Sequence, residues 1–239
     1  MLLIDVGNTR LKWRVQEQGA VTASGALLVS QVDLDELCKA LPNQSSAMAF
    51  ASVGPQKVSD ALSAWAQKFD VPAQKIETQD QWQDLRNGYD NVANLGVDRW
   101  LAMVAARTIT KDKVCIVDCG SAITLDYILA DGCHQGGYII PGARLMSNAL
   151  NADTANIKVM HADIGLASVG KDTREAVLSG CSQMAHHGLK GLIDQAQQQG
   201  YSILLCGGDG ESLAKALGHT YIEGLVLDGL ALMVEANKH

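Results

Sequence analysis

The sequence has little positive charge and no hydrophobic run as long as a membrane span. Its 239 residues include 19 Lys and Arg against 26 Asp and Glu, which gives a formal net charge of −7 at pH 7. Nucleic-acid-binding surfaces need clustered basic residues, and a membrane-spanning helix needs about 20 consecutive apolar residues. We therefore expect small molecules or proteins, and neither nucleic acid nor a membrane, as the partners of this chain.

Targeting and metal-binding patterns are also missing. The chain starts with strand-like sequence instead of a basic segment, an apolar core and a cleavage site, so we expect a cytoplasmic protein. The six cysteines lack the paired short spacings of a zinc site, and several lie in apolar segments, which predicts buried, reduced thiols. The six histidines are scattered and have no metal-ligand spacing.

Two common catalytic motifs are absent, namely a Walker-type phosphate loop and the Gly-x-Ser-x-Gly elbow of many hydrolases. What the chain has instead is 47% hydrophobic residues and 23 glycines, which is typical of a globular protein with frequent turns. Short apolar segments alternate with amphipathic ones. Strands interleaved with helices in this way predict an α/β fold.

The first segment of the chain carries a strong local signal. Residues 2–6 form an apolar run that suits a buried strand, and Gly7-Asn8 is a turn dipeptide that leads into a second strand. A carboxylate, an amide, a hydroxyl and an ammonium group gather near this turn, from Asp5, Asn8, Thr9 and Lys12. Together with accessible backbone N–H groups, they can bind a metal–triphosphate. The alternative is an ordinary hairpin whose polar residues are merely solvated.

The same pattern recurs in the second half of the chain. Residues 4–8 and 117–121 both read apolar, Asp, any residue, Gly, polar, and they lie 113 residues apart. The duplication predicts two homologous α/β domains, residues 1–110 and 111–239, which face each other across a nucleotide-binding cleft. A Gly-Gly-Asp-Gly segment at 207–210 follows a predicted strand and lets backbone approach a ligand.

Apolar periodicity locates the other elements. Strands are predicted at 20–29, 47–53, 75–78, 114–117, 122–129, 132–140 and 202–206. Helices are predicted at 32–41, 57–69, 97–108, 143–150, 211–217, 224–236 and from 172 or 173 to about 199, with Gly180 and Gly188 as candidate breaks. Residues 71–94 and 151–170 are polar and mostly irregular, and a long loop in a compact chain is more often functional than idle.

Asp98 is the candidate general base. It lies in the first turn of the predicted helix 97–108, next to the polar loop. A kinase needs a carboxylate within hydrogen-bond reach of the acceptor hydroxyl, while a lysine and a metal ion spread the charge of the transferred phosphoryl group. The alternative is a helix-capping acid, because the helix dipole also favours a carboxylate at this position.

Five motifs, in order along nearly the whole chain, resemble those of the type III pantothenate kinases. They are residues 5–12, Gly96-Val97-Asp98-Arg99, Asp118-x-Gly-Ser-Ala, Gly136-Gly137-Tyr138-Ile139-Ile140-Pro141-Gly142 and Gly170-x-x-Thr173. The resemblance implies a duplicated, actin-like and ribonuclease H-like two-domain fold with a nucleotide cleft between the halves. It also implies ATP-dependent phosphorylation of pantothenate to 4'-phosphopantothenate, the first step of coenzyme A biosynthesis.

The resemblance further implies roles for individual residues. Asp5 would organise Mg²⁺, Asp118 would bind a monovalent cation, K⁺ or NH₄⁺, and Asp98 would take the proton of the pantothenate hydroxyl. The residues implied to bind ATP are Asp5, Val6, Gly7, Asn8, Thr9, Arg10, Leu11, Lys12 and Ser121, the last standing where the family usually has threonine. Those implied to contact pantothenate are Tyr89, Gly96, Val97, Asp98, Arg99 and Thr173.

Two of these implied contacts define the acceptor site more closely. Arg99 would pair with the carboxylate of pantothenate, as a guanidinium does with planar anions. Thr173 would reach the pocket from the neighbouring subunit, so the resemblance implies a homodimer.

Two other functions fit the same scaffold. One is a non-enzymatic transcriptional accessory factor that keeps the nucleotide-binding fold, and the other is a phosphatase or a kinase for a different acceptor. The combination of Asp5, Lys12, Asp98 and Arg99 favours the pantothenate kinase, because a binding module would not need all four.

Overall fold

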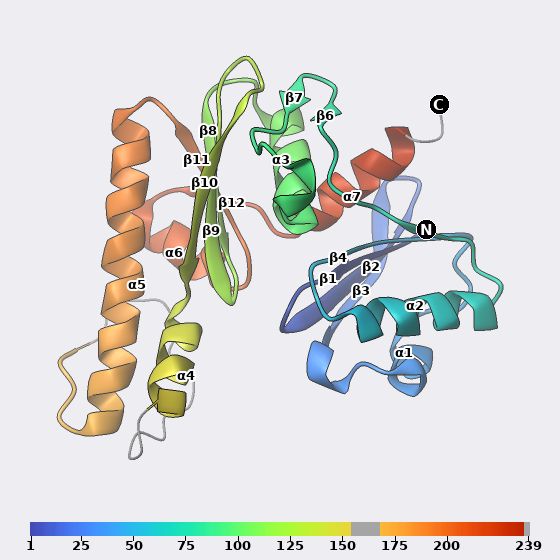
Figure 1. Cartoon of the computed structure of the whole chain (residues 1–239), viewed down its shortest axis with the longest axis horizontal. Helices are drawn as coiled ribbons and strands as arrows, with labels where there is room; N and C mark the ends of the chain where they lie inside the picture. Colours follow the sequence, from blue (N-terminus) through green and yellow to red (C-terminus); the bar gives the residue numbers. More distant parts are fainter. Residues whose placement is uncertain (154–167, 237–239) are drawn as a thin grey trace. The chain divides into compact units, whose positions relative to one another are not determined.

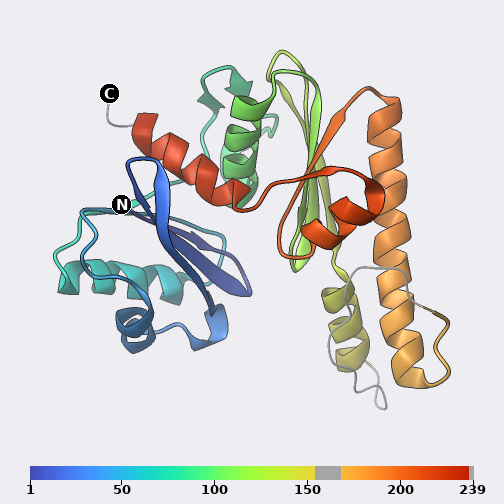
Figure 2. The ribbon, with the colours of Figure 1, turned by 180° about the vertical axis from the view of Figure 1, so that it is seen from behind.

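The computed structural model describes residues 1–153 and 168–236, and it consists of two compact units (Figures 1 and 2). The first unit comprises Met1–Thr108 together with Leu225–His239, and the second comprises Ile109–Gly224. Most of the segment predicted to be irregular at 151–170, including His161, lies outside the described residues.

The first unit contains a five-stranded sheet in the order β3-β2-β1-β4-β5. Strand β1 is antiparallel to β2 and parallel to β4, while β3 and β5 form the two edges. The strands are β1 (Leu2–Val6), β2 (Arg10–Glu17), β3 (Ala20–Leu28), β4 (Met48–Ser52) and β5 (Ala73–Lys75). Strand β5 begins two residues earlier than the sequence predicts, because parallel pairing with β4 and not local periodicity determines where it lies.

Helices cover both faces of this sheet. Alternate residues of β1 point into a core shared with α1 (Leu34–Ala40) and α2 (Gln56–Lys68), in which Trp65 is fully buried. On the opposite face, Arg14 of β2 donates a hydrogen bond from Nη1 to Asp228 Oδ1 of α7 (Leu225–Ala236) at 2.6 Å.

Helix α3 (Val97–Ile109) packs closely on α7 within the first unit. A Cβ atom at Gly229 of α7 would overlap the Leu101 carbonyl of α3, so only glycine allows this approach. The C-terminal helix therefore belongs with the first unit, whereas the predicted range 111–239 includes it in the second. The periodicity of residues 224–236 carries no information about the surface on which they pack.

Short elements complete the first unit. They are the 3₁₀ turns η1 (Val29–Gln31) and η2 (Val92–Asn94) and the two-residue strands β6 (Gln81–Trp82) and β7 (Leu85–Arg86). The last three lie in the segment 71–94, which the sequence predicts to be mostly irregular, and they are too short to produce a periodic signal.

The second unit repeats the sheet topology of the first. Its order is β10-β9-β8-β11-β12, with β8 antiparallel to β9 and parallel to β11. The strands are β8 (Val114–Cys119), β9 (Ala122–Ile128), β10 (His134–Pro141), β11 (Ser202–Cys206) and β12 (Thr220–Tyr221). In both units the acidic turn follows the central strand, which confirms the duplication predicted from residues 4–8 and 117–121.

The second sheet is accompanied by the helices α4 (Ala143–Asp153), α5 (Thr173–Gln198) and α6 (Gly210–Leu217). Residues of α5 and α6 share one core with β8, β9 and β11. Helix α5 is continuous through Gly180 and Gly188, so the expected break does not occur (Figure 1). Buried α5 residues such as Leu189 and Ile193 hold it on the sheet, and this packing outweighs the low helix propensity of glycine.

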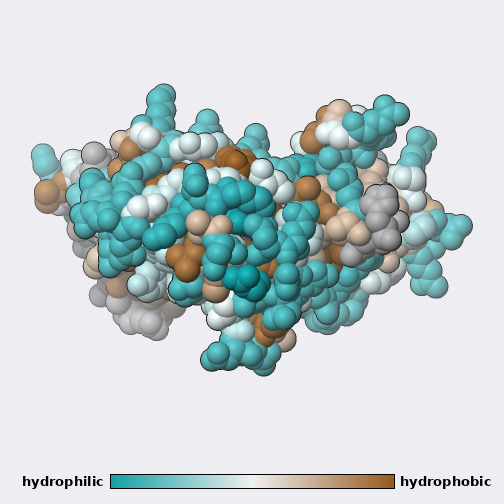
Figure 3. Space-filling model, turned by 90° about the horizontal axis from the view of Figure 1, so that it is seen from above, coloured by the Kyte–Doolittle hydropathy of each residue, from teal (hydrophilic) through white to brown (hydrophobic). Residues whose placement is uncertain are grey.

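The surface is predominantly hydrophilic in the view of Figure 3, with hydrophobic residues scattered among polar ones. Within the described parts of the chain, no helix is long and apolar enough to span a bilayer.

Candidate active site

The first acidic turn connects β1 to β2. Gly7 N–H donates to Arg10 O at 3.0 Å, and Val29 N–H donates to Thr9 O at 2.9 Å, so both ends of the turn are held by backbone hydrogen bonds. Asp5 and Lys12 are paired residues in the antiparallel ladder. Directly paired residues point to the same face, so a carboxylate and an ammonium group lie side by side at the end of the hairpin.

The residues of this hairpin differ in what they can offer a ligand. Val6 and Leu11 are fully buried and anchor the hairpin, whereas Gly7 and Thr9 between them are half-buried. Asn8 and Lys12 are exposed. A Cβ at Gly54, after β4, would lie 2.6 Å from Gly7 O, so the end of β4 also approaches the turn at backbone distance. The result is a polar tip whose backbone is accessible on a rigid, buried base.

The second acidic turn connects β8 to β9. Gly120 N–H donates to Ala122 O at 3.2 Å. Asp118 is half-buried and is paired with Thr124 of β9, which occupies the place that Lys12 has in the first hairpin. The hydroxyl of Ser121 accepts a hydrogen bond from Nη2 of Arg144, the second residue of α4. The second turn therefore has a cation nearby, but it comes from a helix and not from the paired strand.

The glycine segment 207–210 packs on the second turn. Gly207 has φ +86°, and a Cβ there would overlap Asp118 Oδ1 and the backbone of Cys119. Asp209 N–H donates to Cys119 O at 3.0 Å, and the Tyr221 hydroxyl donates to Gly207 O at 3.2 Å. The segment thus meets the carboxylate of Asp118 through backbone atoms, and its approach to a ligand stays a prediction.

The electrostatics around this turn are negative. Burial, followed by the neighbouring carboxylates of Asp118 and Asp209, raises the pKa of the Cys119 thiol to about 12. Cys119 is therefore a neutral thiol at physiological pH and neither a nucleophile nor a thiolate ligand. A cation bound near this strand end would reduce the repulsion between the two carboxylates.

The donor chemistry of the turns fits hard cations. Carboxylate and backbone carbonyl oxygens are the ligands preferred by Mg²⁺, which commonly takes only one or two protein carboxylates and completes its shell with phosphates and water. Asp5 and Asp118 supply one carboxylate each at their respective turns. No group of three His, Cys, Asp or Glu side chains able to cage a metal occurs among residues 1–153 and 168–236. Each turn therefore offers a single carboxylate together with backbone oxygens.

Asp98 is the second residue of α3 and is half-buried. Its Oδ1 accepts a hydrogen bond from the backbone N–H of Arg99 at 2.8 Å, so it uses one of the N–H groups that lack partners within the helix. A Cβ at Gly96 would lie only 2.6 Å from this oxygen. The absence of a side chain at Gly96 therefore permits the observed orientation of the Asp98 carboxylate.

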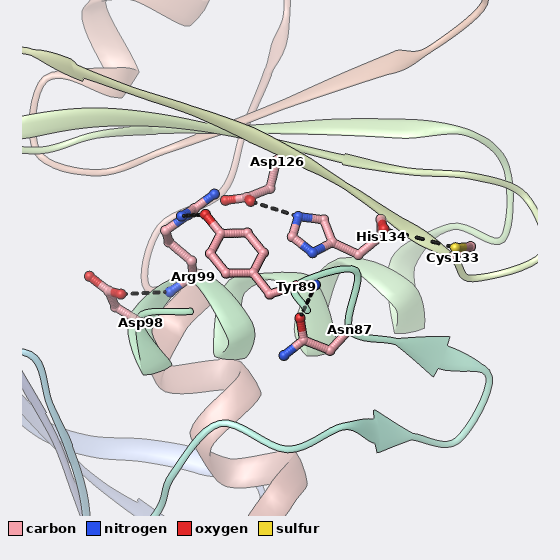
Figure 4. A network of polar contacts seen from close by, with 7 residues as sticks. All are labelled: Asn87, Tyr89, Asp98, Arg99, Asp126, Cys133 and His134. Carbon is pink, nitrogen blue, oxygen red and sulfur yellow. Dashed lines mark hydrogen bonds and ion pairs between the residues drawn. The ribbon is translucent and has the colours of Figure 1, made fainter. Parts of the chain in front are cut away.

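Arg99 and Tyr89 form a preorganised pair (Figure 4). Arg99 is 6% exposed, and its Nη1 donates to Tyr89 OH at 2.8 Å while the guanidinium carbon lies 5.5 Å from the centre of the tyrosine ring. Asn87 Oδ1 accepts from Tyr89 N–H at 3.0 Å and holds the loop. Val97 is buried beneath the start of α3. The structure thus brings together Tyr89, Gly96, Val97, Asp98 and Arg99 in one region of the first unit.

Thr173 belongs to the second unit, at the first position of α5, and is exposed. Asp172 caps the helix by accepting from Glu175 N–H at 2.8 Å, and Lys171 N–H donates to Glu175 Oε2 at 2.9 Å. This reciprocal arrangement fixes the start of the helix and with it the position of Thr173.

Three contacts in the site were not predicted from the sequence. Gly54 and Tyr221 reach the turns only through the tertiary fold, and no local pattern marks them. Arg144 follows the Pro141-Gly142 turn by two residues, and nothing in the local sequence indicates that its side chain contacts Ser121.

Comparison with known proteins gives a consistent result. The sequence model of the type III pantothenate kinases matches residues 1–195. The chain is 35% identical to the type III pantothenate kinase of Hahella chejuensis over 237 residues, which cover 98% of this chain and 96% of that protein. It is 36% identical over 249 aligned positions to the protein of the same name from Pseudomonas aeruginosa, covering 97% and 98% of the two chains.

Solved structures share the fold. A conserved putative Baf family transcriptional activator from Campylobacter jejuni superposes with a TM-score of 0.65 at 22% identity, covering 100% of this chain and 99% of that one. A putative 2-dehydro-3-deoxygalactonokinase from Sinorhizobium meliloti gives 0.57 at 12% identity, with 98% and 96% coverage. With the duplicated sheet topology, these likenesses confirm the predicted duplicated α/β fold of the actin-like class.

Proposed function

The chain belongs to the family of type III pantothenate kinases, and from this membership we propose that it phosphorylates pantothenate at the expense of ATP, forming 4'-phosphopantothenate for coenzyme A biosynthesis. The observation that carries the proposal is 35% identity to a type III pantothenate kinase over 98% of the chain. An accessory role without catalysis has no comparable support, because the likeness to the Campylobacter jejuni protein is at 22% identity and concerns the fold alone.

The direct test is turnover by the purified protein. The protein is incubated with ATP, Mg²⁺, K⁺ and pantothenate, and 4'-phosphopantothenate is identified by mass spectrometry while ADP is measured in parallel. We expect ADP and phosphopantothenate in equal amounts, with neither formed in the absence of pantothenate. ADP release that does not depend on pantothenate would indicate another acceptor or a phosphatase and would refute the proposal.

At the nucleotide, we propose that the hairpin from Asp5 to Lys12 binds the phosphates of ATP. Accessible backbone near Gly7 and the exposed Asn8 and Lys12 side chains support this role. Asp5 would hold Mg²⁺, which neutralises charge on the phosphates when bound. Lys12 would neutralise further phosphate charge directly, and Ser121 would donate its hydroxyl to the nucleotide.

We assign a monovalent cation, K⁺ or NH₄⁺, to Asp118 in the same proposal. The support is the half-buried carboxylate of Asp118 and the nearby charge of Asp209, both of which add to the effect of burial in raising the pKa of the Cys119 thiol. Turnover measured in K⁺, NH₄⁺ and Na⁺ at constant ionic strength tests the assignment. Equal rates in all three would contradict it, as would an Asp118→Asn variant with unchanged cation dependence.

At the acceptor, Asp98 would act as general base. A carboxylate at the start of α3 can accept the proton of the pantothenate hydroxyl as the oxygen attacks the γ-phosphate. Asp98→Asn keeps the shape but cannot accept the proton, so we expect kcat to fall by a factor on the order of 10²–10⁴ with an unchanged melting temperature. Near-normal kcat in this variant would rule out the assignment.

Arg99 would bind the carboxylate of pantothenate, and Tyr89 would hold the guanidinium in position. The 2.8 Å hydrogen bond and the guanidinium carbon 5.5 Å from the centre of the tyrosine ring support this division of roles. Tyr89→Phe removes the hydroxyl but keeps the ring. We therefore expect a higher KM for pantothenate and little change in the KM for ATP.

We propose a homodimer in which Thr173 completes the pocket of the partner subunit. The exposed face of α5 around Thr173 is built of small and apolar residues, since Ala176, Gly180 and Met184 follow at helical spacing and Met184 is 69% exposed. A face of this composition is typical of a subunit contact. The molar mass in solution, measured by light scattering for the wild type and Met184→Glu, tests the contact.

Mixing two inactive variants tests whether Thr173 acts on the neighbouring subunit. Asp98→Asn and Thr173→Ala are each purified, combined under conditions that exchange subunits, and assayed. If Thr173 serves the partner, half of the sites in each mixed dimer are intact, and about a quarter of the wild-type activity returns. If it serves its own subunit, no mixed dimer has an intact site and activity stays absent.

A cytoplasmic location completes the proposal. All six cysteines are free thiols, four of them buried and two half-buried, as expected of a protein that stays in a reducing compartment. Cell fractionation of the native protein tests this assignment.

A further inference from the structure

Arg144 lies directly beside the second acidic turn. It is half-buried in the first turn of α4, and its Nη2 donates a hydrogen bond to Ser121 Oγ. Because the guanidinium is hydrogen-bonded to this hydroxyl, it can also reach a ligand atom that the hydroxyl contacts. Neither the sequence motifs nor the family resemblance gave Arg144 a role.

The backbone fixes this arrangement. Gly142 N–H donates to Ser121 O at 3.1 Å, so the junction of β10 and α4 is bonded to the turn. A Cβ at Gly142 would lie 2.8 Å from Ser121 O and 3.1 Å from Gly120 O, which only glycine avoids. Arg144 O also accepts from Ser147 Oγ at 3.0 Å. The base of the arginine is therefore held over the turn, and its position does not depend on the guanidinium contact alone.

The two hairpins differ in the charge of the residue paired with the aspartate, and the guanidinium of Arg144 makes up for this difference. In the first unit, Lys12 stands opposite Asp5 in the ladder, whereas in the second unit a neutral residue, Thr124, stands opposite Asp118. Two duplicated phosphate-side turns would both gain from a cation, because a nucleotide triphosphate carries several negative charges. Arg144 supplies that charge to the second turn from α4.

We propose that Arg144 binds a phosphate oxygen of the nucleotide together with Ser121. A guanidinium has several N–H donors in one plane and can bind a hydroxyl and a phosphate oxygen at once. The inference rests on the proposed function, in which Ser121 contacts ATP. The ligand class is a nucleoside di- or triphosphate, because adenosine alone offers no phosphate oxygen to the arginine.

The test measures nucleotide binding and not turnover. Full-length Arg144→Met and Arg144→Lys are compared with the wild type by calorimetric titration of ATP and ADP in Mg²⁺, and adenosine is measured by competition. We expect Arg144→Met to weaken ATP and ADP binding by roughly 10- to 100-fold and to leave adenosine unchanged, because a charge-assisted hydrogen bond to phosphate is lost. Arg144→Lys keeps the charge and should recover part of the loss.

Two controls separate this role from a structural one. Lys190→Met removes an exposed charge from α5 of the same unit, where the lysine pairs with Asp194, and should leave all three affinities unchanged. Unchanged ATP affinity in Arg144→Met overturns the proposal. Equal losses for ATP and adenosine overturn it as well, since Arg144 would then merely support the fold.

The outcome is independent of the kinase assay. A wild-type protein that binds ATP but does not phosphorylate pantothenate would refute the proposed function and still allow the Arg144 comparison. A protein that phosphorylates pantothenate but shows no phosphate-dependent effect of Arg144 would refute this inference alone.

Discussion

Replacing Gly229 by alanine tests how tightly α7 is packed on α3. Both Gly229 and Leu101 are buried, and a Cβ at 229 would lie 2.6 Å from the Leu101 carbonyl carbon and closer still to its oxygen. Ordinary carbon–carbon contacts are about 3.5–4.0 Å. The two helices would therefore have to separate by about 1 Å, and the obstacle is backbone that cannot rotate away.

The expected loss of stability follows from two opposing contributions. Overpacking of a buried contact costs about 1–3 kcal/mol. Because both residues are buried and the added atom meets backbone, the cost here should lie near the upper limit of this range. Alanine in a helix interior gains about 1 kcal/mol over glycine. The net destabilisation is therefore about 2 kcal/mol, and at about 2–4 °C per kcal/mol for a chain of this size the melting temperature should fall by about 4–8 °C.

The measurement is thermal unfolding by far-UV circular dichroism, with tryptophan fluorescence as a second probe. All four tryptophans lie in the first unit, so fluorescence reports on the unit that contains α7. Gly191→Ala is the matched control, because it is the same substitution in the interior of α5 with no atom within 4 Å of the added Cβ. This control should raise the melting temperature by a few degrees. If Gly229→Ala behaved like Gly191→Ala, the close packing of α7 on α3 would be refuted.

Two further predictions concern the site and the buried thiols. Gly96→Ala should lower kcat by about 10-fold or more, because the added Cβ displaces the carboxylate oxygen of Asp98. The melting temperature should change little, since this carboxylate can rotate away. A kcat equal to that of the wild type would contradict the geometry. Cys115 and Cys119 should resist iodoacetamide at pH 8, while the half-buried Cys133 reacts, because burial raises the pKa of both thiols from 9.0 to about 12. The unfolded chain loses these two protons near pH 9, whereas the folded chain keeps them until about pH 12. This contribution to stability is therefore complete below pH 9 and falls as the pH rises from 9 to 12. Early labelling of Cys119 by iodoacetamide would show that the strand end opens.

Local patterns predicted the parts of the fold that repeat a simple period. The hairpin of residues 2–17 follows from an apolar run and a glycine turn, and its recurrence at 114–128 follows from the same pattern. The start of α3 was predicted at residue 97 because helical periodicity returns there after a polar loop. Asp98 could therefore be located at a helix start from the sequence alone.

Contacts between distant segments carried no such signal. The pairing of Thr220–Tyr221 with β11 involves too few residues for a period, and the hydrogen bond from Tyr221 to Gly207 depends on it. Arg144 is near Ser121 only because β10 returns beside β9. Helix propensity also predicted a break in α5 at its glycines, but the helix is continuous there because tertiary packing stabilises it.

The packing of α7 on the first unit bears on the order in which the protein can fold during synthesis. A ribosome completes residues 109–224 before it makes the helix that covers β1 and β4, so the nascent first unit has one face of its sheet exposed for the whole of that interval. Folding of the second unit, whose residues are contiguous, can precede completion of the first. In newly made chains, the N-terminal part of the first unit should therefore depend on chaperones for the longest time. This is the reverse of the usual order, in which N-terminal domains fold first.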